Sequence, residues 1–465
     1  MFLSKYIGDR KFYLKVMAIA VPLMFQQVIS AGVNLVGNLM VGRLVIEKAE
    51  KGVGLAAVVV VSKLNNIATF ALFGTMAACT IYIAQYYGAK DKEHLKQAYR
   101  FGILASLMTG IIFFLLASLF PNNLLRFFTD DVQVIEQGVI YLRYMAIALV
   151  PYAITVSISD AMRAIGDVKR PLIASISGML LSCFLNYVLI FGNLGFPRLE
   201  VAGASIGIMI SRFVELAILL IFLATKKYEF NTRVCELFKV EKSLIKNILI
   251  KGAPLVTNEF FWAFGITMLL RFYSTRGTEV MVGYAISQAV ADVFFVLFSG
   301  MAAATTVIIS QNLGANNLEE AKEDAYRLLA FSIFLAFCMG LGMYLTSFVV
   351  PQWFEVTEEA RALAKNFIVI VAAMQWIYMC SAQCYFILRA GGDTVATLLM
   401  DSCYMWTVNI LVVGVLTYYT DFDIIKLYLA GQATDLVKMI IAFYLVKRGK
   451  WIVNLTKKKE LSYEN

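Results

Sequence analysis

The segment from Gly54 to Ala84, GLAAVVVVSKLNNIATFALFGTMAACTIYIA, contains a single charged residue, Lys63. A helix needs about 20 apolar residues to cross a bilayer, because every backbone polar group must be paired internally where water is absent. The segment is longer than this requirement. It therefore predicts a membrane-spanning helix.

Other apolar segments of similar length surround it, and together they predict twelve membrane crossings. Composition agrees, because 60% of the residues are hydrophobic and 16% are charged, whereas soluble domains carry about a quarter charged residues. The predicted fold is an all-α integral membrane protein. The expected spans are 15–41, 54–84, 99–120, 137–157, 171–192, 203–224, 247–272, 281–310, 328–350, 363–388, 394–417 and 424–446.

The chain carries a net charge of +9, and the distribution of basic residues explains this charge. Most of the 41 lysines and arginines fall in the N-terminus, the even-numbered connections and the C-terminus. The positive-inside rule then predicts that both termini are cytoplasmic in a multi-pass protein of a bacterial-type plasma membrane. Membrane lipid is an expected partner, since the basic tail TKKK (456–459) can contact anionic headgroups. No nucleic acid is expected.

The two halves of the chain repeat one another. QYYGAKDKEHLKQAYR begins at Gln85 and QNLGANNLEEAKEDAYR begins at Gln311, so each is a Gln-x-x-Gly-Ala helix end that leads into a charged, helical connector. MRAIGD (162–167) and LRAGGD (388–393) form a second pair with the same offset.

Six predicted spans in each half bring both repeats into the membrane from the same side, so the repeats are parallel. Transporters with such repeats bind their substrate between the two bundles. The predicted domains are an N-terminal lobe (1–225), a cytoplasmic linker (226–246) and a C-terminal lobe with a basic tail (247–465). Pro22 and Pro254 occupy matching positions and are expected to kink or locally unwind their helices, either as hinges or for packing alone.

The usual enzyme motifs are absent from the sequence. The single histidine, His94, lies in a charged connector, and there is no Gly-x-Ser-x-Gly turn and no GxxxxGK phosphate loop. We expect no enzymatic activity and no cofactor. An ATP-driven pump would need such a phosphate loop or a separate partner.

Ionisable residues inside predicted spans are costly and therefore mark candidate functional sites. Glu215 and Asp435 each have a basic residue three positions away, Arg212 before Glu215 and Lys438 after Asp435, which can neutralise them. The acids without a basic residue within four positions are the better candidates for cation coupling: Glu259, Asp292 and Asp401. Local hydrogen bonding is the alternative role for Asp292 and Asp401.

Glu259 lies in GAPLVTNEFFWAFG (252–265), about 18 Å along its predicted helix and so near the bilayer midplane. A carboxyl group there can exchange a proton as water access changes, or bind a metal cation such as Na⁺ with help from carbonyl and amide oxygens. The neighbouring Asn258 and Trp262 are predicted to contact substrate.

The first half offers neutral polar groups in VNLVGNLMVG (33–42). Asn34 and Asn38 are predicted to line a substrate cavity together with Lys63. The alternatives are helix packing for the asparagine stretch, with glycines that allow close approach, and a Lys63 side chain that reaches towards water.

In combination these features resemble the multidrug and toxic compound extrusion (MATE) family of secondary transporters, over residues 19–456. The resemblance rests on the Pro22 segment, NLVGNLMVG, Gln85–Gly88–Ala89, MRAIGD with Pro171, FLNYVLIFG (184–192), VAGASIG, APLVTNEFFWAFG, Gln311–Gly314–Ala315, LRAGGD and GKWIVNLT. It is greatest for bacterial members with the LRAGGD motif. It implies two six-helix lobes around a cavity that opens alternately to either side, and efflux of amphipathic, often cationic compounds in exchange for H⁺ or Na⁺.

The same resemblance assigns the site unequally to the two halves. Glu259 matches the family's helix 7 glutamate, whereas Gly37 and Asn186 stand where relatives have aspartates in helices 1 and 5. We therefore expect a monomeric antiporter of cationic small molecules whose coupling is concentrated in the second half. Two alternatives remain: a flippase of lipid-linked sugars, which would need more cationic groups in its cavity than Lys63 and Arg212 supply, and a non-transporting membrane sensor.

Overall fold

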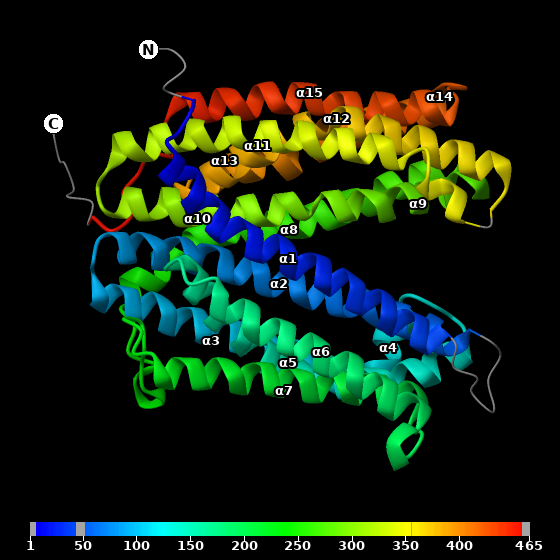
Figure 1. Ribbon diagram of the computed structural model, residues 1–465, viewed down its shortest axis with the longest axis horizontal. Coiled ribbons are helices and arrows are strands. Elements are labelled where there is room, and N and C mark those ends of the chain that lie inside the picture. The colour runs from blue at the N-terminus through cyan, green and yellow to red at the C-terminus, as the bar shows by residue number, and fades with distance from the viewer. Residues whose placement is uncertain (1–5, 43–51, 355, 458–465) are drawn as a thin grey trace. The chain divides into compact units, whose positions relative to one another are not determined.

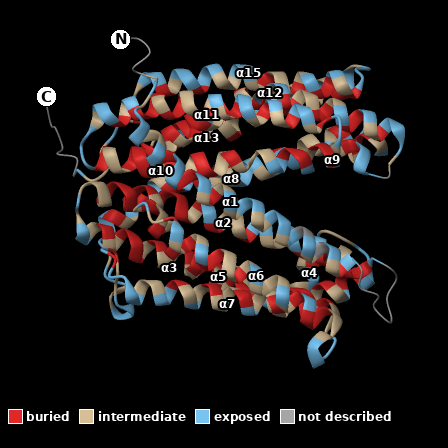
Figure 2. Cartoon of the chain, viewed as in Figure 1, coloured by how far each residue is buried: buried red, intermediate tan, exposed pale blue. Residues whose placement is uncertain are grey.

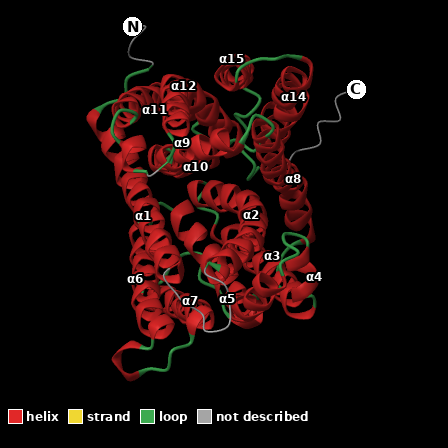
Figure 3. Cartoon of the chain, turned by 90° about the vertical axis from the view of Figure 1, so that its right-hand side faces the viewer, coloured by secondary structure: helices red, strands yellow, loops and turns green. Residues whose placement is uncertain are grey.

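The computed structural model describes residues 6–42, 52–354 and 356–457, apart from the side chains of Leu35 and Asn38. Figure 3 shows that the described residues form helices joined by loops, with no strand among them. This confirms the all-α prediction.

Twelve spans in the described residues are long and apolar enough to cross a membrane, as predicted. They are formed by α1 (Arg10–Gly42), α2 (Val53–Gly88), α3 (Lys92–Leu119), α5 (Val132–Ala164), α6 (Lys169–Phe191), α7 (Glu200–Thr225), α8 (Lys242–Ser274), α9 (Thr278–Phe294) with α10 (Val296–Gly314), α11 (Leu318–Thr346), α12 (Glu358–Ala390), the Thr394–Tyr419 span and α15 (Ile424–Arg448). The helices are labelled in Figure 1.

The eleventh span is the irregular one. It consists of α13 (Thr394–Leu398), two π-helical segments, η5 (Leu399–Cys403) and η6 (Met405–Asn409), and α14 (Ile410–Tyr419). Outside the spans lie α4 (Pro121–Arg126) and the short helices η2 (Asn193–Gly195), η3 (Val234–Glu236) and η4 (Val350–Trp353).

The described chain forms two compact units. The first unit consists of residues 25–83 and 92–248, and the second of residues 6–24, 84–91 and 249–457. The boundary at 248 lies close to the end of the predicted linker. The start of α1 and the end of α2, however, pack within the second unit.

In the first unit, α5 packs against α3 and α7, and α6 packs against α7. The connection after α7 is fixed to this unit by Arg100 of α3. Its guanidinium donates to Thr232 Oγ1 (2.7 Å) and to Glu236 Oε2 (2.8 Å). Phe230 of the same connection is fully buried. The predicted linker is therefore a structured part of the first unit.

Asp167, between α5 and α6, is a second anchor for this connection. Its carboxylate accepts hydrogen bonds from Tyr228 Oη (2.6 Å) and from Arg170. Burial alone would raise the pKa of Asp167, but the hydrogen bonds from Tyr228 and Arg170 outweigh it and lower that pKa. The same contact and burial raise the pKa of Tyr228 to about 12.

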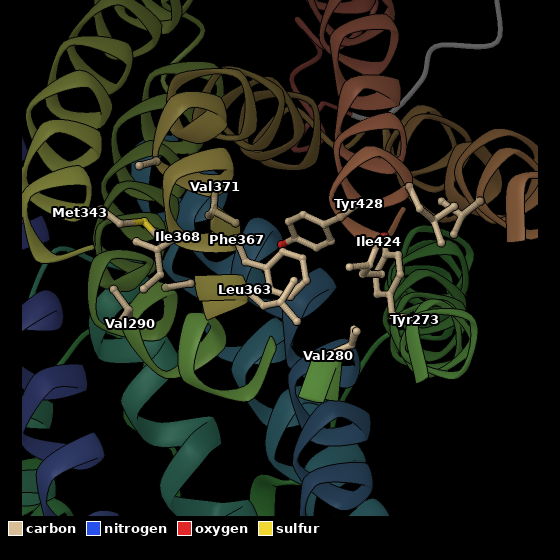
Figure 4. Packing of buried hydrophobic residues seen from close by; sticks show 14 residues of the cluster. Tyr273, Val280, Val290, Met343, Leu363, Phe367, Ile368, Val371, Ile424 and Tyr428 are labelled. Atoms are coloured by element: carbon tan, nitrogen blue, oxygen red, sulfur yellow. The ribbon is translucent and has the colours of Figure 1, made fainter. Parts of the chain in front are cut away.

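In the second unit, α12 is the central helix and contacts α9, α10, α11 and α15. Phe367 and Leu363 of α12 pack with Tyr428 of α15 and Tyr273 of α8 in the core that Figure 4 shows. In an 18-residue apolar stretch of α12, 61% of the residues are buried, whereas in the corresponding stretch of α15 17% of the residues are buried. Figure 2 shows the same contrast, so one face of α15 is available to lipid.

The paired Gln-x-x-Gly-Ala helix ends meet within the second unit. A Cβ atom on Gly88 would lie 2.0 Å from the carbonyl oxygen of Gln311, and one on Gly314 would lie 1.9 Å from that of Gln85. The chain then breaks at left-handed residues, Lys90 (φ 58°) in the first repeat and Asn316 (φ 64°) in the second. After each break the predicted helical connector forms the first turns of α3 or α11.

The segment after α15 covers these helix ends. Leu455 N–H donates to Gln85 Oε1 (2.7 Å), and Asn454 Nδ2 donates to the Gly314 carbonyl (3.2 Å). Trp451 is almost fully buried. The GKWIVNLT motif thus holds the two repeats' helix ends together within this unit.

The matched prolines lie inside unbroken helices, Pro22 in α1 and Pro254 in α8. The predicted local unwinding does not occur in this conformation. A role as hinges through bending remains a prediction.

The close approach of the helix ends makes a specific prediction. Gly88→Ala and Gly314→Ala should each destabilise the protein by about 1–3 kcal/mol, since the added methyl group meets a backbone carbonyl that cannot rotate away. Thermal unfolding of the purified protein in detergent measures this loss. Gly32→Ala is the matched control, because no atom lies within 4 Å of a Cβ at that position. Equal melting temperatures for all three variants would contradict the prediction.

Candidate functional site

Asn258 of α8 is the centre of a buried polar cluster in the second unit. Its side chain is 2% exposed, and its Nδ2 donates to Asp401 Oδ2 (3.0 Å) and Tyr385 Oη (3.4 Å). Its Oδ1 accepts from Ser402 N–H (3.2 Å), and its carbonyl accepts from Ser402 Oγ (2.7 Å). All of these groups are engaged, so Asn258 positions Asp401. Its predicted contact with substrate remains a prediction.

Asp401 also has a charged partner from another helix. Lys438 Nζ of α15 lies 2.6 Å from Asp401 Oδ1, and the two side chains are 18% and 16% exposed. The predicted i,i+3 pairing of Lys438 with Asp435 is therefore wrong: their groups do not form an ion pair in the described structure. The physical reason is that α15 turns Lys438 towards η5, where a carboxylate from a neighbouring helix is closer.

The π-helical segments explain why Asp401 can reach both partners. A π turn widens the helix and changes its hydrogen-bond pattern, and here neighbouring helices pair the polar groups of η5 and η6. Trp406 Nε1 donates to the Phe261 carbonyl of α8 (2.9 Å), and Asn409 Nδ2 donates to Thr434 Oγ1 of α15 (2.7 Å). The wide turns are thus held between α8 and α15.

Glu259 follows Asn258 on α8 and is partly buried. Its carboxylate forms no hydrogen bond or ion pair with the residues that the structure describes. The charged groups whose electrostatic influence reaches it are Arg389 of α12 and Asp401. Glu259 is thus a membrane carboxylate near one basic group and one acidic group, without a direct partner.

Other ionisable residues in the spans are paired more closely. Arg212 Nη1 lies 2.8 Å from Glu215 Oε2, which confirms the predicted i,i+3 pair, and its guanidinium also lies over the ring of Tyr152 at 4.2 Å. Arg163 Nη1 lies 3.0 Å from Asp160 Oδ1. The repeat partner of Arg163 is Arg389, and Phe386 replaces the acid at the matching position. Arg389 therefore lacks a local carboxylate and has Glu259 in its vicinity instead.

The remaining second-unit candidates are Asp292 and Trp262. Asp292 on α9 is exposed and accepts a hydrogen bond from Gln288 Nε2 (2.8 Å). Trp262 on α8 is 37% exposed. Asp292 forms no hydrogen bond or ion pair with Glu259 or Asp401 in the described part of the chain. Their predicted roles remain predictions.

The first-unit candidates lie on α1 and α2. Asn34 and Lys63 are exposed on their helices, and the side chain of Asn38 lies outside the described part of the chain. A Cβ atom on Gly37 would lie 3.7 Å from the amide of Asn186. The two positions where the resemblance implied missing aspartates are therefore neighbours in space, and both are uncharged here.

A comparison with family models gives a match to MatE over residues 22–188 and 254–415. These ranges cover most of the chain. The chain belongs to the MatE family. The matched residues include Glu259 and Asp401, whereas Lys438 lies beyond them.

Named relatives of this MatE protein are bacterial. It is 24% identical over 435 residues to "Probable multidrug resistance protein YoeA" of Bacillus subtilis, with 91% of each chain covered. It is also 24% identical to "Probable multidrug resistance protein NorM" of Thermotoga maritima, with 87% of this chain and 86% of that protein covered.

Solved structures show the same fold. A crystal structure of MATE in the bent conformation matches with a TM-score of 0.86 at 17% identity, covering 96% of each chain. A crystal structure of the Vibrio cholerae MATE transporter VcmN matches with a TM-score of 0.85 at 15% identity, covering 94% of this chain and 97% of that one.

Two cations of this MatE protein's second unit, Lys438 and Arg389, are absent from the predicted site. The repeats contained a signal for both: the offset between Gln85 and Gln311 also relates Arg212 to Lys438 and Arg163 to Arg389. No sequence pattern indicated that α15 would bring Lys438 to Asp401.

No group of three or more His, Cys, Asp or Glu side chains that could hold a metal occurs in the described part, so a cation at Glu259 would need carbonyl, hydroxyl or water oxygens.

The cluster around Asn258 predicts a stability effect. Asn258→Ala should destabilise this MatE protein by about 2–3 kcal/mol, because Asp401 and the Ser402 N–H lose a buried partner. Thermal unfolding in detergent measures the change. Thr267→Ala on the same helix is the control, since Thr267 Oγ1 bonds the Ala263 carbonyl of its own helix. A melting temperature for Asn258→Ala equal to that of the control would refute the positioning role.

Proposed function

We propose that this MatE protein is a secondary transporter that exports amphipathic, cationic small molecules in exchange for H⁺ or Na⁺. Membership of the family, the named multidrug resistance relatives and twelve potential spans support transport of small molecules across a membrane. The proposed orientation places both termini in the cytoplasm and the basic segments against anionic lipid. We propose that it acts as a monomer and without a cofactor.

The observation that carries the coupling proposal is the state of Glu259. The acids that pair with Arg163, Arg212 and Lys438 lie within 3.0 Å of their basic partners. Glu259 has no such contact in the described structure, and an ionised carboxylate among membrane helices is costly without a partner. A proton or Na⁺ from solution can supply the missing positive charge.

Exchange follows from competition for this carboxylate. A cationic substrate and the coupling ion both stabilise the negative charge on Glu259, so occupancy by one disfavours the other. If the inward-open and outward-open states differ in their affinity for each cation, binding shifts the equilibrium between the two states. Asp292 is proposed as a further carboxylate for cations because it is exposed, and Trp262, Asn34, Asn38 and Lys63 as substrate contacts.

Charge pairing favours this function over a lipid-linked sugar flippase. A phosphate group needs free basic side chains, ideally arginines. Arg163, Arg212 and Lys438 are each held by an acid. These three cations are therefore not available to bind a phosphate group, which argues against a flippase.

The proposal predicts that Glu259→Gln abolishes coupled efflux. The amide keeps the size and hydrogen-bonding capacity of the side chain but can neither bind a proton nor neutralise a cation. Efflux of tetraphenylphosphonium from proteoliposomes, driven separately by a proton gradient and by a sodium gradient, measures the effect. The wild-type protein should respond to at least one gradient and the variant to neither.

Asp130→Asn, in an exposed connection, is the control for reconstitution. Monodisperse elution and unchanged melting of Glu259→Gln would establish that it is folded. Undiminished gradient-driven efflux by this variant would overturn the role of Glu259. Absence of efflux by the wild-type protein under both gradients, with a panel of organic cations, would favour a non-transporting sensor.

A further inference from the structure

We infer that Lys438 is a tethered cation that occupies Asp401 and excludes a free coupling ion from this carboxylate. The inference rests on the proposed cation exchange, and it assigns ion selectivity to a residue on α15. Asp401 then contributes a neutralised pair and takes no part in the exchange proposed for Glu259.

At Asp401 the ammonium group of Lys438 takes the place that a bound cation would occupy. Asp401 Oδ1 accepts from Lys438 Nζ at 2.6 Å, and its Oδ2 accepts from Asn258 Nδ2 at 3.0 Å. Both carboxylate oxygens therefore have a donor. A sodium ion at Asp401 would have to displace a buried ammonium that is attached to α15 and hence present at very high effective concentration.

The charges around Lys438 make it stable in this position. Besides Asp401, the groups whose electrostatic influence reaches its ammonium are Asp435 of the same helix and the Tyr404 phenol. Two carboxylates near one ammonium favour its charged form. The Arg276 guanidinium, in the turn after α8, is used elsewhere, since it donates to the Thr417 and Thr420 carbonyls.

Comparison of the repeats supports a neutralising function. Arg212 of α7 and Lys438 of α15 occupy matching positions, and each is paired with an acid. In the first unit that acid, Glu215, lies on the same helix. In the second unit the acid comes from η5, so removal of the lysine would leave Asp401 without its basic partner.

This arrangement predicts a gain of function. Lys438→Met removes the ammonium but keeps a long apolar side chain. Asn258 Nδ2 would still donate to Asp401 Oδ2, and Asp401 Oδ1 would lose its bond to the ammonium and could bind a cation. Carboxylate, hydroxyl, amide and water oxygens are the ligands that hard cations prefer. The variant should acquire an additional saturable sodium site.

The experiment measures the binding of radioactive sodium to the purified protein. Transport is not measured. It is performed in the Glu259→Gln background, so that a failure of the proposed exchange site cannot affect the result. We expect that Glu259→Gln alone shows no saturable sodium binding, that Glu259→Gln/Lys438→Met gains one site, and that further replacement of Asp401 by Asn removes this site.

Each alternative result has a defined meaning. One result would show that a free ion reaches Asp401 despite the lysine. In it, Glu259→Gln binds sodium saturably, and this binding disappears when Asp401→Asn and Lys438→Met are added. That result would overturn the inference. A folded Glu259→Gln/Lys438→Met variant without sodium binding would also overturn it. If that variant does not fold, Lys438→Gln in the same background is tested under the same criteria. Loss of efflux by Glu259→Gln in liposomes tests the exchange site separately.

Discussion

A charge buried among membrane helices must be neutralised, and this constraint organises the polar interior of the protein. The cost of an isolated charge in a low-dielectric interior far exceeds the value of a surface ion pair. Arg163, Arg212 and Lys438 each meet a carboxylate within 3.0 Å. In the described part of the chain Glu259 has no such partner, and this is why it is proposed to exchange a cation.

The two repeats meet this constraint with related polar contacts. Gln26 follows Pro22 by four residues and donates to Ser175 Oγ of α6 (2.9 Å), just as Asn258 follows Pro254 by four residues and contacts Ser402 of η5. Both contacts connect the first helix of a repeat to the fifth. In the second repeat, Asp401 adds a carboxylate beside this contact, and the wide turns of η5 and η6 accompany it. The asymmetry of the proposed site thus results from charges added to a shared framework.

Much of the fold could be predicted from the sequence because it depends on local hydropathy. A run such as 54–84 must span the membrane whatever its neighbours are, and helix α2 (Val53–Gly88) does so within a few residues of the prediction. The repeated Gln-x-x-Gly-Ala motif likewise indicated matched helix ends. The π turns and the path of the segment after α15 depend on contacts between distant residues, and no local pattern indicated them.

The site was predictable in part for the same reason. Glu259 was identified by the absence of a basic residue nearby in sequence, and the structure keeps it without a direct partner. For Asp401 the same rule missed a basic partner, because Lys438 is 37 positions away in sequence and 2.6 Å away in space. The predicted i,i+3 pair of Lys438 with Asp435 was wrong, since Lys438 pairs with Asp401 instead. Ion pairs between helices depend on helix rotation, which hydropathy and spacing do not determine.

The central claim is that substrate and coupling ion compete for the carboxylate of Glu259. The most direct test is to add tetraphenylphosphonium to the purified wild-type protein and measure the cations released, protons with an indicator in weak buffer and sodium with a radioactive tracer. The account predicts stoichiometric release of one of these cations by the wild-type protein and none by Glu259→Gln. Equal release by both proteins, or substrate binding by the wild-type protein with no release of either cation, would contradict it.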